Sequence, residues 1–168
     1  MFFLKDLPTD MPLQEFSRRY PNMNPSALVT CTVLMRTGSD LMAALETALG
    51  RHGMSQGRFL VLIVMNRTPH QEINPSILAE KLGVKRATMT GLLDGLEKDN
   101  FIERLADIRD RRKIGVRLTA EGRQVLEKML PDYYRIMAKL TGSLSEKERE
   151  TLKTLLAKIN SKLSSLFS

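Results

Sequence analysis

The sequence predicts a mainly α-helical fold that carries one small β-hairpin, an α+β arrangement in which the helices dominate. Three observations lead to this prediction. Apolar residues recur at helical spacing through most of the 168 residues. Several of these stretches begin at a capping residue that is followed by proline or, three positions later, by glutamate. Only two stretches, 101–105 and 114–118, change to the period of two that is typical of strands.

Length and composition predict one ordinary globular domain. A chain of 168 residues is long enough to bury its own core. No window approaches 18 apolar residues without a charge, so we expect no membrane span. The first ten residues lack a basic stretch followed by an apolar run, so we expect no secretory signal and a cytoplasmic location. A single cysteine excludes an internal disulfide, and with only two histidines beside it we expect no metal and no cofactor.

The N-terminal part predicts an arm and two helices. Residues 1–23 are interrupted by three prolines and predict an extended arm. Asn24 then caps a long helix that has proline at its first position and stops near Gly50. The apolar stripe of this helix consists of Leu28, Cys31, Met35, Met42, Leu45 and Leu49. A second helix begins after Ser55, and the seven consecutive apolar residues 59–65 predict that it is buried on all sides.

Two short helices follow, joined by a tight turn. The first begins at Asn74, which precedes a proline, and ends at Leu82, and Gly83 marks the turn. The second covers about 85–98, with an apolar stripe at Met89, Leu92, Leu93 and Leu96. Two short helices joined at a glycine predict a helix-turn-helix. The hairpin that follows directly at 101–118 makes this a winged version.

The C-terminal part predicts two more helices. One covers about 120–140, and Pro131 inside it predicts a kink or a break. Ser145 and Glu148 form a capping box that opens the last helix. One face of this last helix carries Leu152, Leu155, Leu156, Ile159, Leu163 and Leu166. This stripe is longer than a small winged lobe can cover and predicts a second subunit, with packing inside one subunit as the alternative.

The positive charge is concentrated at the hairpin. The chain has 26 basic and 19 acidic residues, a net charge of +7, which favours a polyanionic partner. Residues 104–117 contain six basic and two acidic side chains and so carry +4 of that charge. The tip holds Arg109, Asp110, Arg111, Arg112 and Lys113. Because arginine suits the narrow minor groove of DNA, we predict a wing that contacts double-stranded DNA.

The start of the second short helix predicts a second DNA contact. Lys85 and Arg86 place cations at the positive end of the helix dipole, at a cost of about 0.3–1 kcal/mol. This cost is explained if that end of the helix faces phosphates. Thr88 and Thr90 lie off the apolar stripe, where they can contact base edges or a thymine methyl group. An ordinary solvated face is the alternative for the two threonines.

Two motifs resemble the MarR family of bacterial transcription regulators. One is the Asp-x-Arg-Asp-x-Arg stretch at 107–112, followed by Leu-Thr-Ala-Glu-Gly at 118–122. The other is the stretch 78–97, which is similar to the helix-turn-helix of that family. The resemblance covers about residues 25–166. It implies an intertwined homodimer whose lobes reach adjacent major grooves of a pseudo-palindromic operator, while the wings enter the flanking minor grooves.

The resemblance implies one domain, covering 1–168, whose regions have different functions. An N-terminal arm at 1–23 precedes a helical dimerisation region made of 24–50 and 120–168, and the winged DNA-binding lobe is 55–119.

The resemblance also implies roles for single residues. Arg86, Thr88 and Thr90 would face the major groove, and Arg109, Arg111 and Arg112 would serve the wing, with Arg112 inserted deepest. The chain departs from the family at Lys85, where serine is common, and at Asp94-Gly95, where a basic residue is common.

Members of the family commonly respond to small aromatic or anionic ligands that bind between the dimer helices and the winged lobe. Candidate effector residues near this crevice are Arg36, His52, Met54, Ser55 and Arg58. Cys31 resembles the sensing cysteine of the organic-hydroperoxide branch, but Met35 and Leu45 stand where that branch has tyrosines. The simpler interpretation of Cys31 is a small buried hydrophobe, with a redox-sensing regulator as the alternative.

The sequence as a whole predicts a dimeric, sequence-specific DNA-binding transcription regulator, and a repressor rather than an activator. The alternative is a winged-helix module that binds another protein and has only non-specific DNA affinity. Three arginines at the wing tip favour DNA. We assign no catalytic residues and expect no enzyme, because the chain has neither a Gly-x-x-x-x-Gly-Lys phosphate loop nor a Gly-x-Ser-x-Gly elbow.

Overall fold

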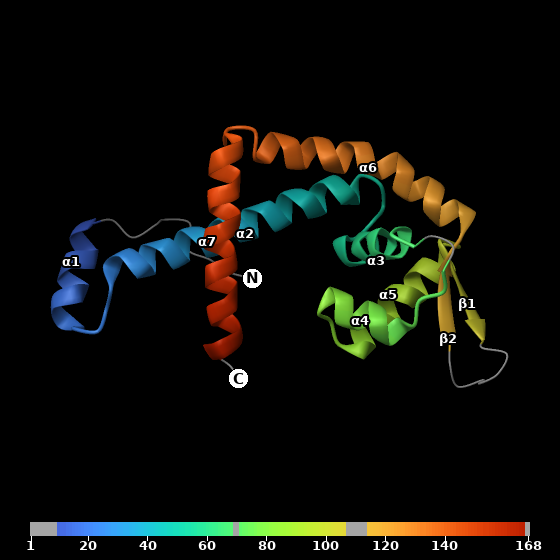
Figure 1. The fold of residues 1–168 in the computed structure, drawn as a ribbon, viewed down its shortest axis with the longest axis horizontal. Helices are drawn as coiled ribbons and strands as arrows, with labels where there is room; N and C mark the ends of the chain where they lie inside the picture. The colour runs from blue at the N-terminus through green and yellow to red at the C-terminus, as the bar shows by residue number, and fades with distance from the viewer. Residues whose placement is uncertain (1–9, 69–70, 107–113, 167–168) are drawn as a thin grey trace.

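The computed structural model describes residues 10–68, 71–106 and 114–166. It confirms a mainly helical fold with one antiparallel hairpin. The elements are α1 (Asp10–Arg19), α2 (Pro25–Gly50), α3 (Gln56–Asn66), α4 (Pro75–Leu82), α5 (Arg86–Lys98), β1 (Ile102–Ala106), β2 (Ile114–Leu118), α6 (Ala120–Leu140) and α7 (Glu146–Leu166). Figure 1 shows α3, α4, α5 and the hairpin gathered in one lobe, with α2 and α6 leading away from it.

Helix α3 lies at the centre of the lobe. Its buried side chains are Phe59, Val61, Leu62 and Met65. Around them pack side chains from every other element of the lobe and from α6, including Leu78, Met89, Leu93, Leu96, Ile102, Val116 and Leu126. Leu60 is 37% exposed, so the prediction that this helix is buried on all sides is wrong at that position. Its side chain points away from the core that covers the rest of the helix.

Side-chain caps define the starts of four helices, and two of them, Asn24 and Asn74, were predicted. Asn24, Ser55, Asn74 and Thr119 each accept a hydrogen bond from an N–H group of the first turn. The Thr119 hydroxyl accepts from the Gly122 N–H at 3.0 Å and donates to the Asn100 carbonyl at 2.7 Å. One side chain therefore fixes both the beginning of α6 and the loop that leads into the hairpin.

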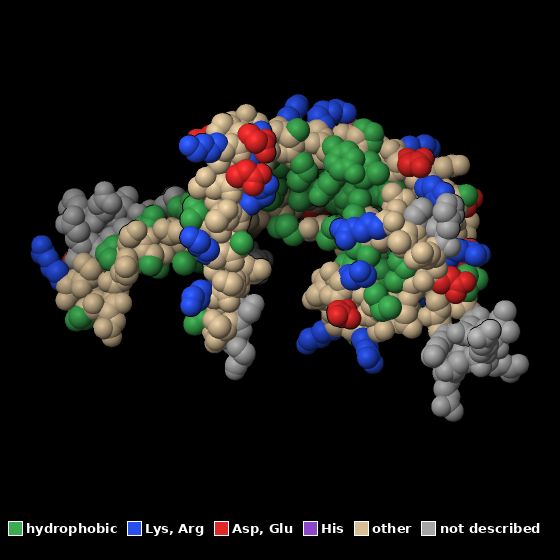
Figure 2. All heavy atoms as spheres, viewed as in Figure 1, with side chains coloured by type: hydrophobic (Ala, Val, Ile, Leu, Met, Phe, Trp, Pro, Cys, Tyr) green, Lys and Arg blue, Asp and Glu red, His purple; other side chains and the backbone are tan. Residues whose placement is uncertain are grey.

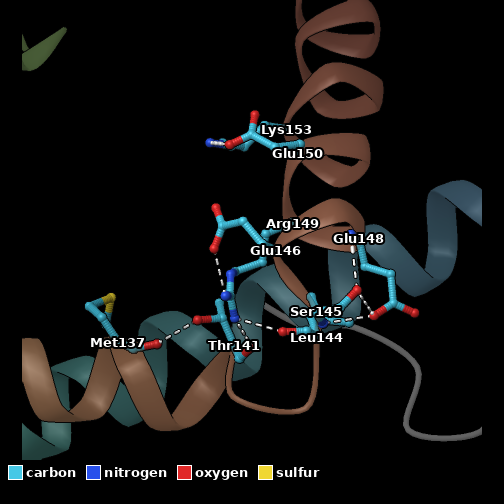
Figure 3. Close-up of polar contacts among 9 residues, drawn as sticks. All are labelled: Met137, Thr141, Leu144, Ser145, Glu146, Glu148, Arg149, Glu150 and Lys153. Carbon is cyan, nitrogen blue, oxygen red and sulfur yellow. Dashed lines mark hydrogen bonds and ion pairs between the residues drawn. The ribbon is translucent and has the colours of Figure 1, made fainter.

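The corner between α6 and α7 is held by side-chain contacts, which Figure 3 shows. Arg149 Nη1 donates to the carbonyls of Thr141 at 3.2 Å and Leu144 at 2.6 Å. The predicted capping box is confirmed, because the Ser145 N–H donates to Glu148 Oε2 at 2.7 Å while Ser145 Oγ accepts from the Glu148 N–H. The hydrogen bonds that the Ser145 hydroxyl, at 2.7 Å, and the Ser145 N–H donate to the Glu148 carboxylate lower the pKa of Glu148. They fix the direction in which α7 leaves α6.

Helices α2 and α7 expose most of their apolar side chains. In α2 only Leu45 and Leu49 are buried. Exposed apolar side chains on the two helices include Leu28, Val33, Leu34, Met35, Met42, Leu152, Leu155, Leu156, Ile159, Leu163 and Leu166. Cys31 is also exposed, which overturns its interpretation as a buried hydrophobe. The first half of α2 extends beyond the lobe, so one chain places no core against it (Figure 1).

Helix α2 bears on the expectation that the chain has no membrane span. By length and composition Pro25–Gly50 is apolar enough to cross a membrane, and only 6% of its most apolar window is buried. Two of its three charged residues, Arg36 and Asp40, form an ion pair at 2.8 Å, and the mean hydropathy of the helix remains high. A single helix of this kind is weak evidence for a span, because apolar helices of other proteins pass the same test.

Two other predictions need correction or refinement. Residues 10–19 form the helix α1, so the extended arm predicted for 1–23 is wrong over that range. Pro12 lies in the first turn of α1, where proline costs no hydrogen bond. Pro131 does not break α6, which continues from Ala120 to Leu140. Figure 1 shows that α6 bends along its length, in keeping with the predicted kink.

Candidate nucleic-acid interface

The helix-turn-helix is built as predicted. Gly83 takes the left-handed conformation, with φ of 65°, and its N–H caps the end of α4. The turn is closed by a hydrogen bond of 3.0 Å from the Val84 N–H to the Ala79 carbonyl. Met89, Leu93 and Leu96 bury one face of α5. The opposite face of α5 is therefore left to solvent at the surface of the lobe.

The exposed side of α5 carries the predicted DNA-reading residues. Lys85, Arg86, Thr88 and Thr90 are all exposed. The Thr90 hydroxyl donates to the Arg86 carbonyl at 3.1 Å, within the helix. Among the described residues the Thr88 hydroxyl has no hydrogen-bond partner, so it is the more available of the two threonines for a contact outside the chain.

The start of α5 differs from the other helix starts of the lobe. Lys85 occupies the N-cap position and makes no side-chain cap, whereas Ser55 and Asn74 cap α3 and α4. As in those two helices, the first turn of α5 contains no acidic residue. The first N–H groups of a helix have no partner within the helix and carry partial positive charge. Together with Lys85 and Arg86 they form a positive end that is suited to an anion.

An open groove of about 360 Å³ lies next to this positive end. It is lined by Asn74, Pro75 and Ser76 at the start of α4, by Arg86, Met89 and Thr90 of α5, and by Ile114 of β2. The groove thus joins the starts of both helix-turn-helix helices to the hairpin. Figure 2 shows Lys and Arg side chains projecting from the lower edge of the lobe, where α4 lies.

The base of the hairpin is fixed to the lobe. The two strands pair in the register Ile102↔Leu118 to Ala106↔Ile114. Ile73, which precedes α4, exchanges two hydrogen bonds of 2.9 Å with Val116. The predicted tip residues Arg109, Asp110, Arg111, Arg112 and Lys113 lie outside the described residues. What the structure fixes is the position from which the tip departs.

Two of the six basic residues counted in the hairpin are neutralised within the chain. Arg104 contacts Asp94 Oδ1 and Glu97 Oε2 of α5, each at 2.6 Å. The hydrogen bond with Asp94 is the main reason that the pKa of Arg104 is raised. Arg117 pairs with Glu103 on the facing strand at 2.8 Å. The net charge of +4 therefore overstates the charge that the hairpin presents to a partner, and Asp94 acts as an anchor for the hairpin.

Sequence reasoning missed the role of Arg58, which we placed among the effector residues. Arg58 Nη2 donates to the Gly95 carbonyl at 3.1 Å and forms an ion pair with Asp99. Its guanidinium also lies 5.9 Å from the centre of the Phe101 ring. Arg58 thus fastens the end of α5 to α3. A contact between residues so far apart in the chain leaves no local signal in the sequence.

The other candidate effector residues lie in different surroundings. Arg36 pairs with Asp40 on α2, Met54 is buried in the core, and Ser55 caps α3. His52 lies in the turn after α2 and approaches Asp132 of α6, with 3.5 Å between Nε2 and Oδ2. His52 also lines a cavity between these two helices. Among the described residues no group of three or more His, Cys, Asp or Glu side chains is placed to hold a metal ion.

A helix-turn-helix followed directly by an antiparallel hairpin defines the class: this is a winged helix-turn-helix protein. The MarR family model matches residues 54–114, which are the lobe from the start of α3 to β2. The HTH-type transcriptional repressor YetL of Bacillus subtilis is 30% identical over 161 residues, which cover 96% of each chain. The chain therefore belongs to the MarR family.

Two further comparisons agree with this assignment. The transcriptional repressor MprA of Escherichia coli is 28% identical over 156 residues, which cover 93% of this chain and 89% of MprA. A crystal structure of the Mycobacterium tuberculosis transcriptional regulator MOSR in complex with DNA matches with a TM-score of 0.65 and 26% identity. That match covers 81% of this chain and 96% of MOSR.

Proposed function

We propose that the protein is a homodimeric transcriptional repressor that binds a pseudo-palindromic site in double-stranded DNA. The observation that carries the proposal is the exposed start of α5, where an uncapped helix end and two cations lie beside an open groove. In helix-turn-helix proteins the second helix enters the major groove and its first residues contact bases. The MOSR complex supports DNA as the partner of this fold, and the names of YetL and MprA support repression.

The homodimer is supported by the exposed apolar residues of α2 and α7. These side chains form long stripes, and exposed apolar patches of this extent mark interaction sites. Leu34 of α2 and the α7 residues Leu156, Ile159 and Leu163 line one open groove of about 390 Å³. A second copy of the chain can fill that groove with its own stripe, since a twofold interface uses the same surface on both subunits.

We also propose that a small-molecule effector modulates DNA binding. The lobe is joined to α2 and α6 through α3, so a ligand between these helices acts on the direction of the lobe. Arg36, His52, Met54, Ser55 and Arg58 remain the proposed effector residues, and Arg58 has the additional role of holding the end of α5. In the described structure His52 is the one that contributes to a cavity between α2 and α6.

The experiment that tests the proposed function is fluorescence anisotropy on the duplex upstream of the protein's own coding sequence. A scrambled duplex of equal composition serves as the competitor. We expect a preference of roughly a thousandfold or more, which is the lower edge of specific recognition. Equal affinity for both duplexes at several salt concentrations contradicts a site on that fragment, and selection of bound genomic fragments then tests every other site.

Salt dependence separates DNA binding from the alternative of a protein-interaction module. About eight phosphate contacts per dimer give a slope of roughly −7 in a plot of log affinity against log salt. A slope near zero on the preferred DNA contradicts the proposal and favours a protein partner. The proposal includes no enzymatic activity, and it places the protein in the cytoplasm with its DNA.

A further inference from the structure

A cavity lies between the end of α2 and the second half of α6, outside the DNA-binding face of the lobe. It is a partly open hollow of about 230 Å³, and the charged side chains around it are largely exposed to solvent. Its polar lining consists of Arg51 and His52 from the α2 side and Asp132, Arg135 and Lys139 from α6, with Ile136 as part of the apolar wall. Basic side chains from two elements that are far apart in the sequence thus meet around one hollow.

The charges around this cavity do not balance. Asp132 supplies its single carboxylate and shares it between two neighbours. Arg135 Nη2 lies 2.6 Å from Asp132 Oδ1, and His52 Nε2 lies 3.5 Å from Asp132 Oδ2. Arg51 and Lys139 have no carboxylate partner among the described residues. Three permanent cations against one carboxylate leave an excess of two positive charges.

Helix ends account for part of this arrangement. Arg51 follows the last residue of α2, and Lys139 lies in the last turn of α6. Cations at such positions stabilise a helix by about 0.3–1 kcal/mol through its dipole. That explanation applies to each residue alone. It does not explain why both line the same cavity as Arg135, which lies a full turn before Lys139.

We propose that this cavity binds a compact dianion, either a phosphate group or a dicarboxylate. Two excess positive charges match two negative ones, and guanidinium groups bind phosphate and carboxylate oxygens with paired hydrogen bonds. The volume lies below the roughly 300–1,000 Å³ of pockets for drug-sized ligands, so the ligand is small.

Because of the position of the cavity, a bound ligand can affect how the lobe is held relative to the long helices. A dianion held by Arg51 and Lys139 bridges α2 to α6. Directly beside it, a second hollow shares His52, Asp132 and Ile136 and is floored by apolar residues of α2 and α6: Leu45, Leu49 and Met129. The bridge therefore strengthens the contact that fixes the long helices relative to the lobe. This regulatory use rests on the proposed function, whereas binding of the dianion does not.

The histidines supply a local probe for the test. The chain contains two histidines, so the imidazole Hε1 region of a ¹H–¹³C spectrum holds two signals. The variant His70→Gln assigns the His52 signal. Inorganic phosphate and succinate are titrated into the full-length protein at pH 8 and constant ionic strength, with acetate as the monoanion and chloride as the salt control. We expect the His52 signal to shift and saturate with phosphate or succinate, and acetate to bind at least tenfold more weakly.

Three variants sharpen the test. Arg51→Gln and Lys139→Gln each remove one cation of the cavity and are expected to weaken binding at least tenfold. Lys128→Gln removes a charge from the same helix α6 outside the cavity and is expected to leave binding unchanged. A response to phosphate alone, or to succinate alone, identifies the kind of dianion.

Two results overturn the site. One is a His52 signal that responds to every anion as it does to chloride. The other is a loss of thermal stability in Arg51→Gln and Lys139→Gln with unchanged dianion affinity, which leaves these residues as helix-end cations only. DNA binding is measured by anisotropy on the same samples. Dianion binding without DNA binding contradicts the proposed function and supports the site, and the reverse result contradicts the site alone.

Discussion

Replacing Lys85 by serine should stabilise the protein and weaken its binding to DNA. Lys85 occupies the N-cap of α5 without a side-chain cap. Serine there can accept a hydrogen bond from the first turn, which adds about 1 kcal/mol, within a range of roughly 0.5–2. Removing the cation from the positive end of the dipole adds about 0.3–1 kcal/mol. We therefore expect each subunit to gain about 1–2 kcal/mol in its free energy of unfolding.

The effect on DNA binding follows from counterion release. A dimer loses two cations at the interface, so the slope of log affinity against log salt should become shallower by about 1.8. A difference of that size changes the affinity ratio of parent and variant by about twelvefold between 50 and 200 mM salt. The DNA affinity of the parent protein should therefore exceed that of the variant most strongly at low salt. The variant should unfold at the higher temperature.

The assay pairs a salt series of anisotropy titrations with thermal unfolding, and one variant separates the two effects. Lys85→Gln removes the charge without supplying a good cap, so it should lose the same DNA affinity and gain only the dipole contribution to stability. Lys128→Gln on α6 controls for the loss of any one charge. An unchanged salt slope in Lys85→Ser refutes the placement of this residue at the phosphates, and a loss of stability refutes the description of its helix end.

Three further predictions concern the wing, base reading and packing. Arg112→Ala should weaken binding to specific and random duplex alike, with the larger loss at A·T-rich flanks; equal losses whatever the flank reject reading of groove width. Thr88→Ala should alter base preference at one position in each half-site, measured by selection from random sequences, and an unchanged preferred sequence excludes Thr88 as a reader. Gly122→Ala should destabilise the fold by about 2–3 kcal/mol in denaturant unfolding, because its Cβ would lie 2.1 Å from the Phe101 carbonyl oxygen. The control Gly91→Ala has open space around it and should gain about 0.5–1 kcal/mol, and equal stability of the two variants contradicts the packing argument.

Local patterns in the sequence predicted the elements that depend on local causes. Caps at Asn24, Asn74 and Ser145 and the turn at Gly83 were identified correctly, because each acts over three or four residues. The extended arm predicted for 1–23 is wrong over 10–19, because prolines do not exclude a helix that has Pro12 in its first turn. A proline in that place is compatible with a helix, so proline content alone was an unreliable guide.

Contacts between distant segments could not be predicted in the same way. The sequence shows Asp94 as a departure from the family, which commonly has a basic residue there, but the structure pairs Asp94 with Arg104. Arg58 was assigned to an effector crevice, but it holds the end of α5. In both cases the sequence reveals a charged side chain without revealing its partner. For the tip of the wing the sequence is the more informative source, because its charge is evident there and residues 107–113 lie outside the described residues.

The apolar helix α2 is exposed to solvent in the single chain, and this exposure needs an explanation. Its hydropathy is high enough for a membrane span, and it is almost unburied in one chain. A membrane would cover the helix evenly around its axis and would have to accept the pair Arg36 and Asp40 in its interior, which is costly. A second subunit needs to cover only the apolar stripe and leaves the charged face in water. In the proposed dimer, the apolar stripe on α7 of the second subunit would provide that cover; α7 lines a groove together with Leu34 in the single chain. A dimer therefore accounts for the hydropathy, the exposure and the charge pair together, whereas a span accounts only for the first two.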